Sequence, residues 1–188
     1  EIYIEKKKKE AEERRRDEDA YVRLARASLE SYILSRKIIE IPEDLPHEMR
    51  EDRAGVFVSI HENGNLRGCI GTFLPLTGCI ANEIITNAIS ASTRDLRFTP
   101  ITENELPFLD ISVDVLSEPE EIASVDELDV KRYGVIVSAG GKRGLLLPDL
   151  EGVDTVEEQI QIARNKAGIL PTEEIQLQRF EVVRHGDK

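Results

Sequence analysis

A short segment, Leu66 to Thr72, constrains the fold more than any other part of the chain. Gly68 comes directly before Cys69, Gly71 follows two residues later, and Arg67 precedes them. Glycine weakens a strand interior, so two glycines around one thiol indicate a bulge, a tight bend or a place where another molecule approaches the backbone. The segment is therefore a predicted strand and also a candidate site.

The residues before this segment predict that it is the second strand of a hairpin. Val56 to Ile60 is rich in β-branched residues, and Asn63-Gly64 suits the positive φ angles of a two-residue turn. Leu66 to Thr72 should then fold back on the first strand.

A regular hairpin with Glu62 facing Asn65 also predicts the register. Ile60 would oppose Arg67, and Val58 would oppose Cys69. Arg67 and Cys69 would then share one face, with His61 on the other. A bulge at the glycine between Arg67 and Cys69 would change this assignment.

Helical spacing of apolar residues predicts a first helix from Asp17 to about Lys37 and a second from about Thr77 to Ser92. Thr102 to Glu105 has capping-box spacing for a short helical turn. Alternation of apolar and polar residues then predicts a strand from Asp110 to Leu116.

The second half of the chain repeats the same plan. Its predicted elements are a strand at 134–138, a Gly140-Gly141 turn, a return strand at 143–147, a helix at 155–167 and a strand at 175–183. The pairs Gly64/Gly141, Arg67/Arg143 and Pro75/Pro148 are 77, 76 and 73 residues apart. We therefore predict an α+β fold with mainly antiparallel sheet and flanking helices, in two lobes at about 17–117 and 118–188.

The repeat bears on the role of the thiol. Leu145 follows Arg143 by two residues, as Cys69 follows Arg67. The hairpin itself therefore does not require a cysteine at this position.

Composition restricts the partners of the chain. It has 188 residues and a formal net charge of −12, which repels phosphate backbones and makes nucleic acid an unlikely partner. No apolar run approaches the ~20 residues of a bilayer span, and two cysteines fit a reducing compartment, so we expect a cytoplasmic protein with no membrane contact.

Residues 1–16 are densely charged, and we interpret them as a charged linker, a frayed helix or a fusion junction.

Cys69 has three possible roles. It could be a small buried hydrophobe, a residue that lines a ligand site or acts in redox chemistry, or a covalent nucleophile. Arg67 on the same face would favour the thiolate, but no histidine is predicted nearby to act as a base.

The arginines offer a second constellation. Arg67, Arg94 and Arg97 could form a cationic pocket for an anionic small molecule, with Asp95 orienting an arginine. Alternatively, Asp95 forms an ion pair that holds the loop after the helix. No Cys-x-x-Cys or His-x-x-x-His spacing occurs, so no metal site is predicted, and the sequence does not indicate a cofactor.

These motifs together resemble the AMMECR domain family. The resemblance is carried by 66–72, by Arg94-Asp95-Leu96-Arg97-Phe98, by Ile111-Ser112-Val113 and by the Gly-Lys-Arg-Gly-Leu-Leu-Leu-Pro stretch at 141–148, and it covers about 17–184. It implies a cytosolic α+β domain found beside, or fused to, a Memo-type protein related to non-haem iron dioxygenases and a radical-SAM protein. It also implies a site at the core motif, which maps onto Arg67, Gly68, Cys69, Ile70, Gly71 and Thr72.

The resemblance brings no established reaction, so several functions stay open. The first is an enzyme or enzyme component with a small-molecule cleft built from the strand at 66–72 and the loop at 94–98. The second is a non-catalytic module that docks a Memo-type or radical-SAM partner through the same surface. The third is an RNA-associated regulator, which the acidic charge disfavours.

Overall fold

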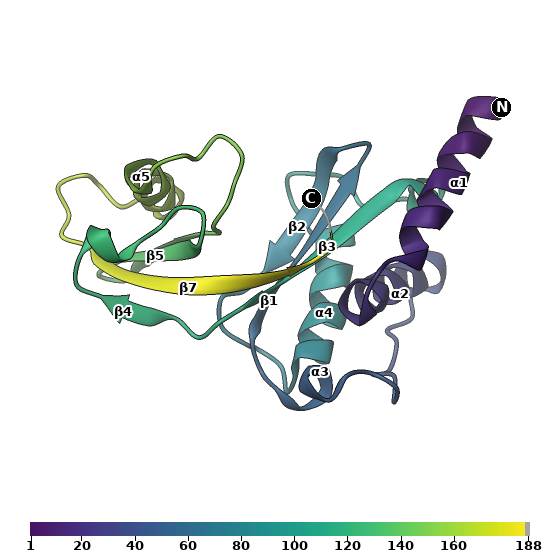
Figure 1. The fold of residues 1–188 in the computed structure, drawn as a ribbon, viewed down its shortest axis with the longest axis horizontal. Helices are drawn as coiled ribbons and strands as arrows, with labels where there is room; N and C mark the ends of the chain where they lie inside the picture. Colours follow the sequence, from purple (N-terminus) through teal and green to yellow (C-terminus); the bar gives the residue numbers. More distant parts are fainter. Residues whose placement is uncertain (187–188) are drawn as a thin grey trace. The chain divides into compact units, whose positions relative to one another are not determined.

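A computed structural model describes residues 1–186 and divides the chain into two compact units (Figure 1). Unit 1 comprises residues 1–115 and the chain from Arg184 onward, and unit 2 comprises residues 116–183. No helix within the described part of the chain is long and apolar enough to cross a bilayer.

Unit 1 is built from helices and a small antiparallel sheet. Its elements are α1 (Ile2–Arg16), α2 (Ala20–Ser35), α3 (His47–Glu51), β1 (Gly55–Glu62), β2 (Asn65–Gly71), α4 (Ile80–Thr93), the 3-10 helix η1 (Glu103–Phe108) and β3 (Leu109–Leu116), which runs into unit 2.

Local sequence signals explain where these elements begin. The Asp19 side chain accepts a hydrogen bond from the Val22 backbone N–H and caps α2. Thr102 and Glu105 form the predicted capping box at η1. Asn63 and Gly64 both have positive φ, as the predicted hairpin turn requires. The helix expected at 17–37 and the hairpin are therefore confirmed.

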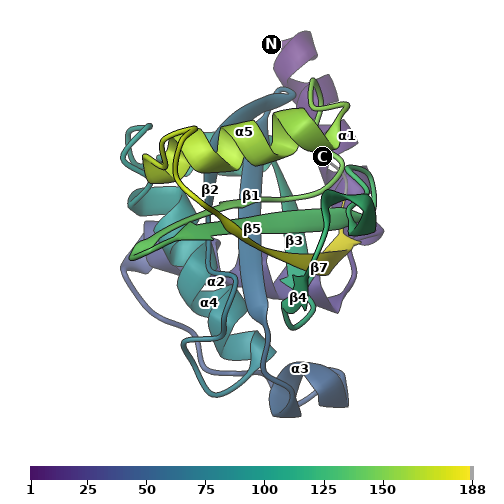
Figure 2. The ribbon, with the colours of Figure 1, turned by 90° about the vertical axis from the view of Figure 1, so that its left-hand side faces the viewer.

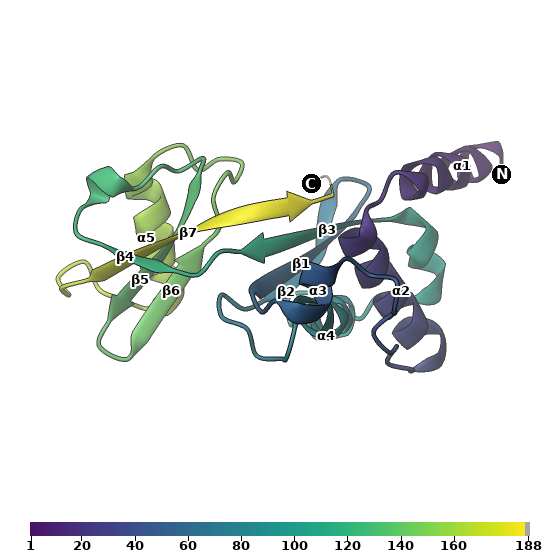
Figure 3. The ribbon, with the colours of Figure 1, turned by 60° about the horizontal axis from the view of Figure 1, so that its bottom comes forward.

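The core of unit 1 lies between one face of the sheet and two helices. The strands occur in the order β2-β1-β3, α4 packs on β1 and β2, and α2 packs on α4 (Figures 1 and 3). Val58 and Ile60 of β1 and Ile84 and Ala88 of α4 are completely buried in this core. The helical spacing that predicted α4 thus identified these apolar residues of its buried face, but it placed Glu83 and Asn87 on the opposite face, and both are buried.

The predicted hairpin register is wrong by one residue beyond the turn. Glu62 pairs with Asn65 as expected, but Ile60 pairs with Gly68 and Ser59 pairs with Cys69. The register shifts between Ile60 and His61 because Arg67 is an extra residue in β2, a β-bulge that a regular ladder does not accommodate.

Unit 2 repeats the hairpin, helix and strand of unit 1. Its elements are β4 (Glu120–Ile122), the 3-10 helix η2 (Val125–Glu127), β5 (Tyr133–Ala139), β6 (Lys142–Leu146), α5 (Val156–Ala167) and β7 (Gln176–His185), whose last residues belong to unit 1. The strand order is β4-β7-β5-β6, all antiparallel, and α5 packs on β5 and β6 (Figure 2). Thr155 caps α5 through the Glu158 backbone N–H, as predicted.

The two units use the same packing device at equivalent positions. A buried helix amide donates to the first strand of the hairpin in each unit: Asn87 Nδ2 to the Val56 carbonyl, and Gln159 Nε2 to the Tyr133 carbonyl, both at 2.9 Å. A glycine of the second strand also lies against the helix backbone in each unit, Gly68 in β2 and Gly144 in β6. The repeated hairpin, helix and strand of the predicted α+β fold are thus observed.

Residues 2–16 form the helix α1, in which only Ala11 is buried, so a helix is the alternative observed for these charged residues. Three short elements were not predicted from the sequence, and the 3-10 helix η2 is one of them. The second is the short helix α3, formed by His47 to Glu51. The third is β4, which lies in a stretch of the chain rich in acidic residues. Short or highly charged elements have too little apolar periodicity to be recognised.

Candidate functional site

The backbone of Cys69 is held by the side chains of a neighbouring loop. β2 is at the end of the strand order, so within residues 1–186 the outward-facing N–H and C=O of Cys69 have no further strand to pair with. Asp95 Oδ2 accepts the Cys69 N–H at 3.0 Å, and an Arg97 guanidinium N–H donates to the Cys69 carbonyl at 3.5 Å. The loop at 94–98 therefore fixes the edge strand where it carries the thiol.

The thiol itself lies beside a hydroxyl group. Cys69 Sγ is 3.1 Å from Ser59 Oγ on the paired strand β1. Ser59 is 2% exposed, whereas Cys69 is half-buried and has a free thiol. Cys79, the other free thiol, is only 5% exposed and precedes α4. The two cysteines therefore differ clearly in accessibility.

The side chains at the equivalent positions of unit 2 have no polar atoms. Ile136 pairs with Leu145 in the β5–β6 hairpin, just as Ser59 pairs with Cys69 in the β1–β2 hairpin. The glycines that precede Cys69 and Leu145, Gly68 and Gly144, both lie against helix backbone. The fold thus explains the glycine but not the hydroxyl–thiol pair.

The bulge also corrects the expected position of His61. Ser59 and His61 are two residues apart on β1, so both project from the sheet face that carries Cys69. The predicted separation of His61 and Cys69 onto opposite faces is therefore wrong.

Arg67 is engaged by groups of the protein. Its Nε is 2.9 Å from Glu105 Oε1, and its terminal nitrogens donate to the carbonyls of Thr99 and Pro100. Burial by itself would raise the pKa of Glu105, but hydrogen bonds from Arg67 and from the Thr102 N–H lower it to about 2. Burial and a hydrogen bond with Glu105 raise the pKa of nearby Glu62. Arg67 therefore joins the bulge to η1.

Asp95 and Arg97 form a second ion pair. Arg97 Nε and a terminal nitrogen lie 3.0 and 2.8 Å from the two oxygens of Asp95, which is buried. The hydrogen bond from Arg97 lowers the pKa of Asp95 to about 2, and the hydrogen bond to Asp95 raises the pKa of Arg97. The Arg97 side chain is 59% exposed and lies over the Phe98 ring. It is therefore both paired and accessible to a ligand.

The remaining predicted site residues have separate surroundings. Ile70 packs against the unit 1 core, and a Cβ at Gly71 would overlap Val56 and Phe57. Thr72 donates its hydroxyl to the Leu74 carbonyl at 2.6 Å. Arg94 ends α4 and is exposed. The structure thus brings Cys69, Asp95 and Arg97 together, ties Arg67 to Glu105, and leaves Arg94 outside both groups.

Leu96, between the two loop arginines, is 100% exposed. The loop that carries it is closed by the Phe98 N–H, which donates to the Asp95 carbonyl at 3.0 Å, and by the Asp95 side chain. A leucine is thus displayed to solvent by an ordered turn.

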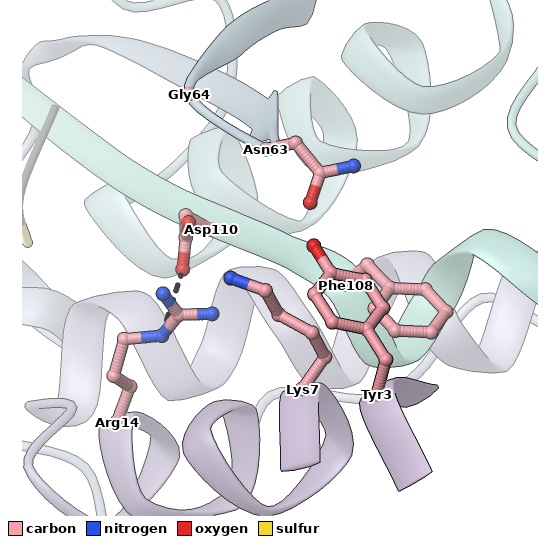
Figure 4. Close-up of a pocket in the computed structure, with 7 residues that line it drawn as sticks. All are labelled: Tyr3, Lys7, Arg14, Asn63, Gly64, Phe108 and Asp110. Atoms are coloured by element: carbon pink, nitrogen blue, oxygen red, sulfur yellow. Dashed lines mark ion pairs between the residues drawn. The ribbon is translucent and has the colours of Figure 1, made fainter. Parts of the chain in front are cut away.

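Two neighbouring hollows of unit 1 are lined by residues other than Cys69. One of about 290 Å³ is enclosed by α1, the β1–β2 turn and the start of β3 (Figure 4). A neighbouring hollow of about 580 Å³ includes His61 and several carboxylates. Cys69, Arg67 and Arg97 line neither of them. Among residues 1–186, no group of histidine, cysteine and carboxylate side chains is arranged to hold a metal ion.

Sequence reasoning missed two partners of the site, Ser59 and Glu105. The register shift hid Ser59, although the repeat contained a signal for it. The offset between the copies falls from 77 at Gly64 to 76 at Arg67, which means that the first copy holds one more residue there. Glu105 was recognised as a capping residue, but not as the partner of Arg67.

These features define an α+β protein with a repeated hairpin unit and a thiol on an edge strand. The pattern of the AMMECR1 family matches residues 22–185, so this chain belongs to the AMMECR1 family of uncharacterised proteins.

Three similar proteins illustrate the range of the family. A Clostridium acetobutylicum protein is 52% identical over 180 residues, which cover 95% of this chain but 38% of the relative. This chain thus spans well under half of that relative. A Thermotoga maritima protein is 49% identical over 170 residues, covering 89% of this chain and 98% of the relative. The crystal structure of an uncharacterised Pyrococcus horikoshii protein matches with a TM-score of 0.80 at 34% identity, covering 87% of this chain and 88% of that one.

Proposed function

We propose that this protein is a cytosolic enzyme or enzyme component that binds a small molecule in a cleft at the strand 66–72, with the Cys69 thiol in contact with the substrate. The observation that carries the proposal is the Ser59–Cys69 pair at 3.1 Å, at positions where the second hairpin has Ile136 and Leu145. Because the fold accommodates two aliphatic side chains there, the polar pair calls for another explanation.

The way in which the thiol is held supports this role. Asp95 accepts a hydrogen bond from the Cys69 N–H and is itself held by Arg97, so the backbone that carries the thiol is fixed in position. Groups that react or bind well are usually fixed in this manner by a supporting shell of hydrogen bonds. The exposed part of the Arg97 guanidinium would bind an anionic group of the substrate, and Asp95 would orient it.

The Cys69 thiol could act in either of two ways. As a ligand contact or redox group, Cys69 needs only access and a polar neighbour, and Ser59 supplies the neighbour. As a nucleophile it also needs a base, and His61 on the same sheet face is the candidate. We assign Cys69 the contact role, with covalent catalysis as the alternative.

Ligand capture tests the proposal. The wild-type protein, Cys69→Ala, Arg97→Ala and Cys79→Ala are dialysed against a bacterial metabolite extract, and retained compounds are identified by mass spectrometry. We expect one anionic compound to be retained by wild type and Cys79→Ala and lost from Cys69→Ala and Arg97→Ala. Equal retention by all variants, or a Cys69 thiol that iodoacetamide fails to modify in the native protein, contradicts the proposal.

A second candidate function is a docking module for a Memo-type or radical-SAM partner. It is favoured by Leu96, fully exposed on an ordered loop, and by the Clostridium relative, in which the matched region is part of a longer protein. Mixing with purified candidate partners distinguishes the two functions. Docking predicts that Leu96→Ala abolishes complex formation and that Cys69→Ala preserves it.

RNA association is the third candidate, and the net charge of −12 argues against it. It would appear as an affinity for RNA that falls steeply with added salt.

A further inference from the structure

Unit 1 has a hollow of about 290 Å³ whose lining residues all differ from those of the Cys69 site. We call it the α1 hollow, and its lining is contributed by α1, by the β1–β2 turn and by the segment that enters β3. The lining residues are Tyr3, Lys7, Arg14, Asn63, Gly64, Phe108 and Asp110 (Figure 4). Its volume suits a molecule the size of a substituted benzene ring.

The α1 hollow contains two cations that are only partly neutralised. Arg14 Nε is 3.4 Å from Asp110 Oδ1, and Lys7 Nζ is 3.6 Å from Glu10 Oε2, both longer than the usual charge-assisted hydrogen bond. In Figure 4 the Lys7 ammonium and the Arg14 guanidinium point toward the same space. Asp110 is the one carboxylate among the lining residues, so these two cations leave the lining with a net positive charge of 2 − 1 = +1, which favours an anion.

Two aromatic rings supply the apolar part of the lining. Phe108 is half-buried, and Tyr3 is 71% exposed, so a flat ligand placed beside Tyr3 would remove apolar surface from water. Lys7 Nζ lies 5.8 Å from the centre of the Tyr3 ring, which puts the cation next to the aromatic wall. The Asn63 side chain faces the same space from the turn and offers an amide (Figure 4).

We propose that the α1 hollow binds a small aromatic carboxylate or a similar anion carried on a flat apolar body. Its anionic group lies between Lys7 and Arg14, and its ring lies against Tyr3 and Phe108. This assignment is independent of the proposed function at Cys69, because the two sites share no residue.

Other ligand classes fit the α1 hollow less well. A cation would meet two positive groups, Lys7 and Arg14, against the single carboxylate of Asp110. A nucleic acid would bring many phosphates against a chain of net charge −12. The neighbouring hollow is lined by Asp17, Glu18 and Asp19, so a second anionic group on the ligand would be repelled there. A monoanion is therefore the expected ligand.

Titration of the labelled full chain with benzoate, followed by two-dimensional NMR, tests the proposal. Benzamide serves as the neutral analogue, and inorganic phosphate as the anion without a ring. We expect benzoate to shift the amide signals of Asn63, Gly64 and Asp110, and benzamide to shift them much less. Binding should also slow amide exchange in α1, because the ligand adds a link between α1 and the turn.

Matched variants identify the groups responsible. Lys7→Gln and Arg14→Gln should each weaken benzoate binding about tenfold, whereas Lys8→Gln and Arg16→Gln, exposed on the same helix but outside the lining, should change it less than about twofold. Tyr3→Ala should weaken benzoate binding but leave phosphate binding unchanged. Glutamine keeps the helix propensity, so loss of α1 is not the expected cause.

Three results would overturn the assignment. Equal binding of benzoate and benzamide would remove the role of the anion. Equal losses in Lys7→Gln and Lys8→Gln would reduce the effect to the general charge of α1. Signal shifts spread over the surface, without a focus at residues 63, 64 and 110, would show that benzoate has no defined site.

Discussion

The Cys69 Sγ atom lies 3.1 Å from the Ser59 Oγ atom across the β1–β2 hairpin, beside the bulge at Arg67. The contact exists because the bulge shifts the register by one residue. Without that shift, Cys69 would face Val58, which belongs to the buried core. The bulge thus moves the thiol to the sheet face that carries Ser59.

Ser59→Ala should slow alkylation of Cys69 by iodoacetamide about three- to tenfold, because one hydrogen bond to the sulfur contributes about 0.5–1.5 kcal/mol. Intact-mass kinetics at fixed pH measure the rate, and the buried Cys79 in the same molecule serves as the internal control. An unchanged rate would mean that the hydroxyl does not influence the thiol.

Asp95 should make stability depend on acid. Its folded-state pKa is lowered from 3.8 to about 2, so the folded state binds this proton less readily than the unfolded state. The stabilisation is therefore complete above about pH 4 and is lost as the pH falls toward 2. We expect it to be on the order of 1–2 kcal/mol, reduced by the solvent exposure of Arg97.

Urea unfolding of wild type and Asp95→Asn between pH 2 and 7 measures this effect. The difference in the free energy of unfolding should be largest near neutral pH and shrink below pH 4. A difference that stays constant with pH would show that the carboxylate charge of Asp95 contributes nothing.

Arg67→Lys should destabilise unit 1 by about 2 kcal/mol, although it keeps the charge. Lysine cannot contact Glu105 and the Thr99 and Pro100 carbonyls with one planar group, as the Arg67 guanidinium does. Arg94→Lys, at an exposed position, is the matched control and should change stability by less than about 0.5 kcal/mol. Equal effects of the two substitutions in urea unfolding would contradict the structural role of Arg67.

Gly68→Ala and Gly144→Ala should each destabilise the protein by about 1–3 kcal/mol, because a Cβ would overlap the carbonyl oxygen of Ala91 or Ala163 on the packed helix. Gly141→Ala, where the added Cβ meets no atom within 4 Å, is the control and should be nearly neutral. Differential scanning calorimetry measures all three variants. Tolerance of Gly68→Ala would mean that α4 can move away from β2.

Much of the fold was predictable because short sequence signals specify local geometry. The Asn63-Gly64 turn and the caps at Thr102 and Thr155 depend on a few neighbouring residues, and all three are observed. The bulge was not predicted, because the alternation of side chains along a strand does not reveal one extra residue. The drop in the repeat offset from 77 to 76 did indicate that residue. The ion pair of Asp95 was one of the alternatives that the sequence offered, and its partner Arg97 is only two residues away. The contact of Arg67 with Glu105 was not predicted, because the two residues are 38 apart in the sequence and only the tertiary fold brings them together.

The hydrogen bonds of Asp95 and Arg97 with the Cys69 backbone have a consequence for assembly. An uncovered edge strand would let another polypeptide pair with β2 and form intermolecular fibrils or domain-swapped dimers. Here an incoming chain would first have to break the hydrogen bond between the Asp95 carboxylate and the Cys69 N–H. The two side chains that bind the Cys69 backbone thus also hinder the addition of another chain to this edge of unit 1.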